Sequence, residues 1–184
     1  MTSPIERIRQ RLAAESADAL FVTTPSNIRY LSGFTSADAQ LLITTDCTLL
    51  ATDFRYYEQA GREAPAWELF KVEKPWLQAM EELFHAANVR RLAFESTNLT
   101  FARYQELSTI ADLELVPAKG WVEALRAIKT PEELTCIRQA VALSDAAVAA
   151  LPQLWRPGMT GRELAWEMEA CMRTRGSEGL AFPL

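Results

Sequence analysis

The feature of this sequence that most constrains its fold is an alternation of two hydrophobic patterns. Short apolar segments alternate with longer segments in which apolar residues recur at helical spacing. Their length and composition favour strands for the apolar segments and amphipathic helices for the rest. Two strand segments, QLLITT and TLLATD, follow one another across Asp46 and Cys47 in hairpin-like fashion. The strand segments are ALFVTT, QLLITT, TLLATD, WELFKVE, RRLAFE and LELVP. The sequence therefore predicts an α/β domain with a mixed sheet flanked by helices, ending near Ile128.

Helix signals fill the intervals between these strands. Ser3, Pro4 and Glu6 match a capping box with proline at the first helical position, so a helix is expected from there to about Ser16. A further helix is expected to end near Gly33. That helix is NIRYLSGF, and the remaining helical segments are FRYYEQAGREA, PWLQAMEELFHAA, TFARYQELSTI and GWVEALRAI.

After Ile128 the pattern changes to two long amphipathic helices. A capping box at Thr130 and Glu133 begins the first, which is expected to stop at Pro152. Thr160 and Glu163 begin the second, with Gly176 as its expected C-cap, and SEGLAFPL then reads as extended. Two helices with apolar stripes cannot form a closed core alone. We therefore expect the chain to be a fragment, whether by design, by cleavage or by truncation of a gene.

Composition narrows the function classes. The net charge is -5 and the basic residues are scattered, which argues against nucleic-acid binding. The chain shows neither a leader-like start nor a long apolar stretch, so we expect a cytoplasmic protein that does not enter membranes. Its 3 cysteines are widely spaced and fit reduced thiols. A nucleotide-binding domain has little support, because no phosphate-cradling loop occurs.

Self-contained catalytic motifs are also missing from the sequence. There is no HExxH, and RGSEG does not have the GxSxG spacing. The chain has a single histidine, His85, so it cannot supply a histidine-rich metal centre. We interpret His85 as a surface or boundary residue of a helix with no catalytic role.

Two strand-to-helix turns carry the candidate site residues. NIRYLSGF places Asn27 and Tyr30 after one strand, and TDFRYYEQA places Asp53 and Arg55 after another, where α/β proteins commonly present ligand-facing groups. An arginine in such a turn could clamp a carboxylate through two hydrogen bonds. Alternatively, Asp53 caps the following helix, Arg55 pairs with it locally, and the tyrosines pack with their hydroxyls at the surface. The residues alone leave both interpretations open.

The ordered series of segments closely resembles Xaa-Pro aminopeptidases and prolidases, which are pita-bread metallopeptidases related to creatinase. The resemblance is collinear over essentially the whole chain, which makes it more specific than any one segment. The segments are DALFVTTPSNIRYLSGFTSADAQLLIT, TDFRYYEQA, LAFESTNLTFARYQEL, WVEALRAIKTPEEL, PGMTGRELAWEME and RGSEGLAFP.

This resemblance implies a creatinase/prolidase-type N-terminal domain, ribonuclease H-like, over residues 1–128. Residues 129–184 would be the truncated start of a pita-bread α+β catalytic domain, represented by its first two helices. In the family that domain holds two divalent metal ions (Mn, Co or Zn) which activate water to attack the bond before proline. The ligands, two Asp, one His and two Glu, would follow the point that matches the end of this chain. No catalytic or metal-binding residue is therefore assigned here.

The resemblance further implies a homodimer that acts on Xaa-Pro peptides. The N-terminal domain would reach towards the active site of the neighbouring subunit, which makes Asn27, Tyr30, Asp53 and Arg55 candidates for a substrate lip or a dimer interface. Our leading hypothesis is the N-terminal part of an aminopeptidase P or a prolidase, inactive alone. The alternative is a non-catalytic dimerisation or peptide- or protein-binding module of the same fold.

Overall fold

The computed structural model describes residues 2–182, in which two compact units are separated at the Ala127–Ile128 bond. The first unit holds the sheet that the sequence predicts. Its strands are β1 (Ala19–Val22), β2 (Ala39–Thr44), β3 (Thr48–Thr52), β4 (Glu68–Lys71), β5 (Arg91–Glu95) and β6 (Glu114–Ala118). The strand order is β4-β3-β2-β1-β5-β6. β2 runs antiparallel to both of its neighbours and the other pairs are parallel, so the prediction of a mixed α/β sheet is confirmed.

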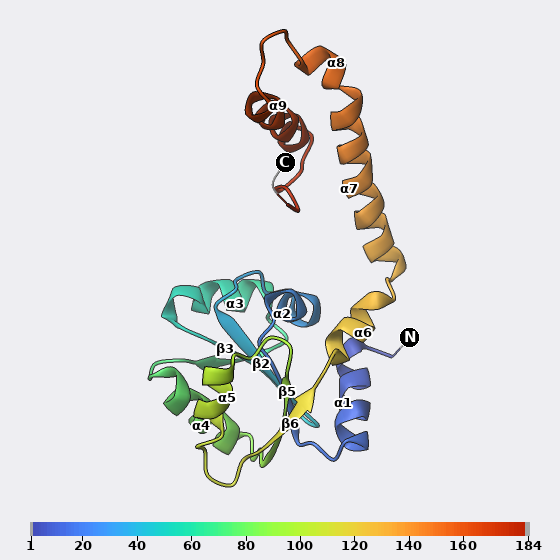
Figure 1. Ribbon diagram of the computed structural model, residues 1–184. Coiled ribbons are helices and arrows are strands. Elements are labelled where there is room, and N and C mark those ends of the chain that lie inside the picture. The colour runs from blue at the N-terminus through green and yellow to red at the C-terminus, as the bar shows by residue number, and fades with distance from the viewer. Residues whose placement is uncertain (1, 183–184) are drawn as a thin grey trace. The chain divides into compact units, whose positions relative to one another are not determined.

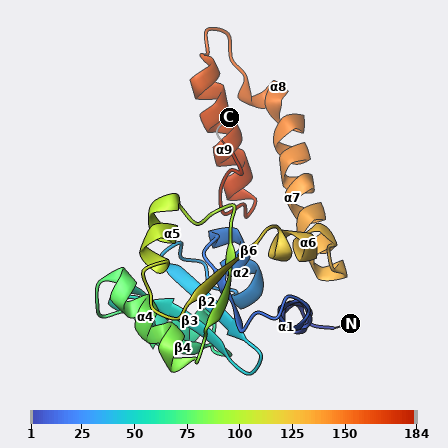
Figure 2. The same cartoon turned by 60° about the horizontal axis from the view of Figure 1, so that its bottom comes forward.

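Helices cover both faces of the sheet, as Figures 1 and 2 show. One face packs against α1 (Pro4–Ala14), α2 (Pro25–Ser32), α3 (Tyr57–Glu63) and α6 (Trp121–Ala127). The other face packs against α4 (Trp76–Ala86) and α5 (Phe101–Leu107). Each layer buries its own cluster of apolar side chains against the sheet. The first unit is therefore a three-layer α/β domain with two cores.

Strand β1 lies between β2 and β5 and has no polar side chain. Leu20 and Val22 enter the core under α1 and α2, whereas Ala19 and Phe21 enter the core under α4. All four residues are fully buried. A strand covered on both faces has to be apolar at every position rather than at alternate positions. This is why ALFV reads in the sequence as a continuous apolar run.

Gly33 ends helix α2, as the sequence predicts. It adopts φ 80°, and its N–H donates to the Arg29 carbonyl at 2.8 Å. A Cβ at this position would lie 3.3 Å from the Glu63 carbonyl oxygen. Glycine is thus favoured both by the left-handed backbone and by the close approach of α3.

Some helix boundaries differ from the expected ones. The Ser3 side chain accepts a hydrogen bond from the Glu6 N–H, but the Glu6 carboxylate pairs with Arg9 instead of completing the capping box. The segment after Asp53 begins with a 3-10 turn, η1 (Phe54–Tyr56), before α3. The pairing of neighbouring side chains decides these helix starts, and the sequence motif alone does not specify that pairing.

The second unit contains α7 (Pro131–Ala149), α8 (Leu151–Leu154) and α9 (Gly161–Thr174). The capping boxes at Thr130 and Thr160 both form, so these helix starts are confirmed. α7 ends at Ala149, close to the end expected at Pro152. Pro152 itself lies in the first turn of α8, where proline costs no hydrogen bond, and this four-residue helix, which the sequence did not predict, separates the two long ones. α9 has its C-cap at Arg175, one residue before the expected Gly176, which adopts φ 102°.

Apolar residues on α7 remain at the surface of the second unit. Ile137, Val141 and Val148 are each at least 45% exposed, which agrees with helices that need further cover. The extended segment expected after Gly176 contains no strand up to residue 182, and Pro183 and Leu184 lie outside the described residues. Among the described helices, none has the length and apolar character needed to cross a membrane.

Candidate functional site

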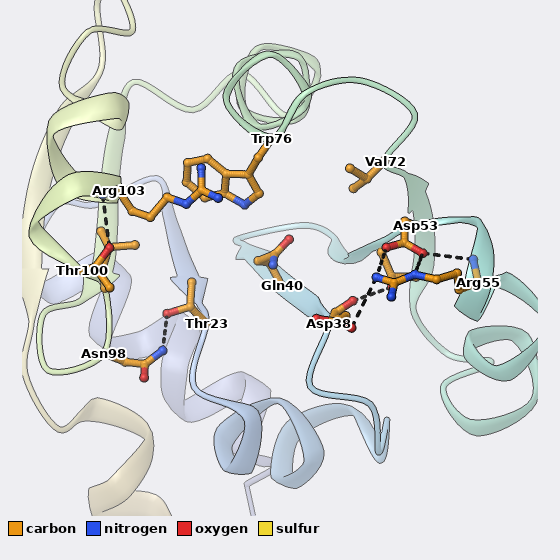
Figure 3. A pocket seen from close by; sticks show the side chains of 12 residues that line it. Thr23, Asp38, Gln40, Asp53, Arg55, Val72, Trp76, Asn98, Thr100 and Arg103 are labelled. Carbon is orange, nitrogen blue, oxygen red and sulfur yellow. Dashed lines mark hydrogen bonds and ion pairs between the residues drawn. The ribbon is translucent and has the colours of Figure 1, made fainter.

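A groove of about 360 Å³ lies at the edge of the sheet where the parallel strands end (Figure 3). Thr23 follows β1, Thr52 ends β3, Val72 follows β4 and Asn98 lies in the loop after β5, and all four line it. In open α/β sheets the carboxyl ends of the strands are the usual place for ligands. The volume is at the small end of the range for small-molecule sites.

One end of the groove is formed by Asp38, Asp53 and Arg55. The Asp53 carboxylate caps η1 by accepting from the Arg55 N–H at 3.0 Å, and it binds the Arg55 guanidinium at 2.9 Å through Nε and 2.6 Å through Nη2. Arg55 Nη2 also lies 3.4 Å from the Asp38 carboxylate, which accepts from the Tyr56 hydroxyl at 3.1 Å. The interpretation of Asp53 as a cap with Arg55 as its local partner is thereby confirmed. Two carboxylates share one guanidinium, so this end carries excess negative charge.

The same pairing sets the acidity of this cluster. The hydrogen bond from the Arg55 side chain holds the pKa of Asp53 below its ordinary value, and Asp53 in turn raises the pKa of Arg55. A carboxylate with a lowered pKa stabilises the folded chain above its ordinary pKa of about 3.9. That contribution is lost as the pH falls through the lower pKa of the folded state. The ion pair is therefore intact at neutral pH.

Replacing Arg55 with glutamine should move the pKa of Asp53 upwards, towards its ordinary value. The physical reason is the loss of the bidentate hydrogen bonds that favour the ionised carboxylate. Carboxyl-carbon NMR across an acid titration measures the change. Arg62→Gln is the matched control, because Arg62 lies 3.7 Å from Glu63 and is 70% exposed. A pKa of Asp53 that is the same in Arg55→Gln and in the unmodified chain would contradict this assignment.

Trp76 and Arg103 form the opposite end of the groove. The Arg103 guanidinium carbon lies 4.1 Å from the centre of the Trp76 ring, a cation-π arrangement. Its Nη1 donates to the Glu106 carboxylate at 2.6 Å. Trp76 is held in turn by Phe21, with ring centres 6.5 Å apart. Sequence reasoning missed this pair, since the two residues are distant along the chain and neither stands in a motif.

Asn27, a predicted site residue, lies instead in a buried hydrogen-bond network. Its side-chain amide donates to Glu95 at 2.6 Å and to Glu123 at 2.8 Å, and its carbonyl accepts from Arg126 at 2.8 Å. The Glu95 carboxylate also accepts from the backbone N–H groups of Thr23 and Thr24, both at 2.7 Å. Asn27 is fully buried and Glu95 is 4% exposed. The network ties the start of α2 to β5 and α6.

The structure thus separates the four predicted residues. Asp53 and Arg55 lie together in the groove, whereas Asn27 belongs to the buried network and Tyr30 is half-buried against the core under α2. A role for all four at a lip or a dimer interface stays a prediction. Asp38, Trp76 and Arg103 join the site from outside the predicted turns.

His85 has the surface position that the sequence predicts. Its side chain is 66% exposed on α4 and lies 4.0 Å from Glu81. Between residues 2 and 182, no three His, Cys, Asp or Glu side chains gather as a metal ion would require. In the groove, Asp38 and Asp53 are both engaged by Arg55. The described donor set therefore does not fit a dinuclear metal site.

A mixed sheet of this order, with helices on both faces and a groove at its carboxyl edge, defines a three-layer α/β domain of the kind that binds ligands at the strand ends. The chain belongs to the Creatinase/Prolidase N-terminal domain family, whose model matches residues 4–128. Residues 135–184 match the model of Metallopeptidase family M24.

Relatives support the same assignment over the whole chain. The sequence is 30% identical to the Uncharacterized peptidase YqhT of Bacillus subtilis, covering 98% of this chain and 51% of the relative. The structure is similar to the Xaa-Pro dipeptidase from Bacillus anthracis, with TM-score 0.90 and 30% identity over 97% of this chain and 50% of the other. It is also similar to the N-terminal domain of cytoplasmic peptidase PepQ from Mycobacterium tuberculosis, with TM-score 0.61 and 32% identity over 68% and 99% of the two chains. The chain spans about half the length of the curated relatives it matches.

Proposed function

We propose that this chain serves as the N-terminal part of an Xaa-Pro peptidase, an enzyme that hydrolyses the peptide bond before proline. The observation that carries the proposal is the order of the two family matches, the N-terminal domain at residues 4–128 and the metallopeptidase at residues 135–184. The likeness to an Xaa-Pro dipeptidase structure over 97% of this chain supports the substrate class. The proposal covers both an aminopeptidase and a dipeptidase.

Catalysis in such an enzyme would depend on residues other than those described here. The match to a metallopeptidase family supports metal use, and we propose two divalent metal ions, with Mn, Co and Zn as the candidates, which would supply Lewis-acid chemistry when bound. The described part of the chain offers no group of ligands for them. We therefore assign this chain a structural and substrate-facing part, and we expect the 184 residues alone to be inactive.

The proposal extends to assembly and location. A homodimer would bring the groove edge of one N-terminal domain to the active site of its neighbour, with Asp53 and Arg55 at the lip. A cytoplasmic location is favoured by the likeness to the N-terminal domain of the cytoplasmic peptidase PepQ. Reduced cysteines agree with it, since Cys47, Cys136 and Cys171 are all unpaired.

An activity assay on two proteins tests the function. The 184-residue chain and the complete product of its gene should be incubated separately with Mn²⁺, Co²⁺ or Zn²⁺ and with Xaa-Pro dipeptides or longer peptides that begin Xaa-Pro. We expect turnover by the complete product and none by the chain. Turnover by the chain itself would contradict its inactivity. A complete product that binds metal without hydrolysing any of these peptides would favour the non-catalytic module.

Arg55→Ala in the complete, active protein tests the lip. We expect a KM raised several-fold, or a weakened dimer, with metal content unchanged, because Arg55 organises two carboxylates at an exposed edge. Steady-state kinetics, size-exclusion with light scattering and metal analysis measure the three quantities. Arg62→Ala, an exposed arginine outside the groove, is the control. Unaltered KM and oligomeric state would leave Arg55 with its local capping role alone.

A further inference from the structure

The groove has opposite charges at its two ends. Asp38 and Asp53 together carry one more charge than Arg55 balances, and Asp38 is 56% exposed. Across the groove, Arg103 lies flat on Trp76 (Figure 3). A guanidinium has five N–H donors, and among the described residues the Arg103 guanidinium uses one of its nitrogens, Nη1, for Glu106. Stacking on the indole fixes the guanidinium plane and leaves its edge available for a carboxylate.

Neutral polar groups fill the space between these ends. Thr23, Gln40 and Thr52 come from three adjacent strands or their ends, and Asn98 donates to the Thr23 hydroxyl at 3.0 Å. Hydroxyl and amide side chains of this kind can bond a peptide unit, which has one donor and one acceptor. The Thr52 hydroxyl already donates to the Asp38 carbonyl at 2.6 Å, so it is left as an acceptor. Together with the apolar side chains of Val72 and Leu99, which also line the groove, these groups match a molecule with a cation at one end, an anion at the other and amides between them.

The width of the groove sets the length of that molecule. Its central part, from Thr52 at the end of β3 to Thr23 after β1, crosses two strand spacings, which amount to about 10 Å. An extended chain covers about 3.3–3.6 Å per residue, so two or three residues fit this span better than one. A single amino acid would reach the groups at one end only.

The geometry points to a binding site for short peptides with free termini, in which the α-ammonium group binds at Asp38 and Asp53 and the α-carboxylate binds at Arg103. The site belongs to the N-terminal domain itself and does not require that the protein hydrolyse peptides.

Calorimetric titration of the 184-residue chain, with a chelator present, tests this site without any turnover. The probes are alanyl-alanine, trialanine, N-acetyl-trialanine, trialanine amide and free alanine. Removing either terminal charge should weaken binding about five- to tenfold, as expected when a charge-assisted hydrogen bond is lost at a half-exposed site. Free alanine should bind more weakly than both peptides. Backbone amide shifts of Thr23, Gln40 and Thr52 should move on peptide addition.

Two substitutions assign each terminus to its end of the groove. In Asp38→Asn, acetylation of the peptide should weaken binding by less than about twofold, while amidation keeps its full effect. Arg103→Gln should show the reverse pattern. Asp46→Asn, in the turn between β2 and β3, and Arg62→Gln, on α3, are matched controls outside the groove and should leave both effects in place.

Three results would overturn the proposal. The first is the absence of amide shifts in the groove at millimolar peptide, in a chain whose spectrum shows it folded. The second is equal binding of the charged and the capped peptides. The third is alanine binding as tightly as trialanine, which would replace a peptide site with an amino-acid site. All three results are measured as binding to the chain itself, without turnover. Failure of this proposal can therefore be distinguished from failure of the peptidase assay.

Discussion

Replacing Asn27 with alanine is expected to destabilise the first unit by about 3 kcal/mol, as is typical when hydrogen bonds to buried charged groups are lost. Asn27 is the side-chain donor to both Glu95 and Glu123, and it is fully buried. Within residues 2–182, Glu95 would then keep the bonds from Thr23 and Thr24 while remaining nearly inaccessible to water. Water could not replace the lost hydrogen bond, because solvent does not reach the Glu95 carboxylate.

Native-state amide hydrogen exchange of β1 measures this free energy for the first unit alone. Asn98→Ala is the matched control, because Asn98 is exposed and also donates one side-chain hydrogen bond, and it should change stability by about 0.5 kcal/mol or less. If the amides of β1 were as protected from exchange in Asn27→Ala as in the control, the network would not stabilise the first unit. A role for Asn27 at the lip would then regain support.

Phe21→Ala should cost a similar or larger amount, about 3–5 kcal/mol. Phe21 is fully buried at the centre of the sheet and meets Phe84 edge to face, with ring centres 5.3 Å apart. Its removal leaves a cavity that β1 and α4 cannot close without moving strands that pair on both sides. Phe101→Ala, at a side chain 73% exposed, is the control and should be nearly neutral.

Urea unfolding followed by the fluorescence of Trp76, which lies against Phe21, reports this change if the other tryptophans are replaced. The midpoint should fall while the dependence on urea stays constant, as for a loss of stability without a change of the unfolded state. A midpoint equal to that of Phe101→Ala would show that the core under α4 repacks freely. Arg103 stacks on Trp76, so a shift of Trp76 in the Phe21→Ala variant would also displace Arg103 in the groove.

The fold was predictable from sequence because its signals are local. Caps at Thr130 and Thr160, the glycine at position 33 and the all-apolar β1 each follow from the residues within one turn or strand. The short helix α8 was missed because proline both ends a helix and begins one, and Pro152 does both within a few residues.

The candidate site was predictable only in part, for a related reason. Asp53 and Arg55 are two residues apart, so their pairing could be anticipated from the turn. Asn27 stands in an equivalent turn, yet its partners Glu95 and Glu123 come from much later in the chain. Arg103 meets Trp76 only after α5 packs beside α4. Contacts of this kind depend on the sheet order, which no single segment encodes.

The order of the strands also bears on how the domain acquires its structure in time. The β2–β3 hairpin joins neighbouring segments, whereas β1 must find β5, whose residues follow about seventy positions later, as in the pair Leu20–Ala93. Closing so long a loop costs conformational entropy that only later contacts offset. The β2–β3 hairpin should therefore form early and the β1–β5 pairing late. The Asn27–Glu95 bond spans the same interval and should be absent from the transition state. Weakening it would then chiefly speed unfolding and shorten the lifetime of the folded domain, a difference that stopped-flow kinetics can resolve.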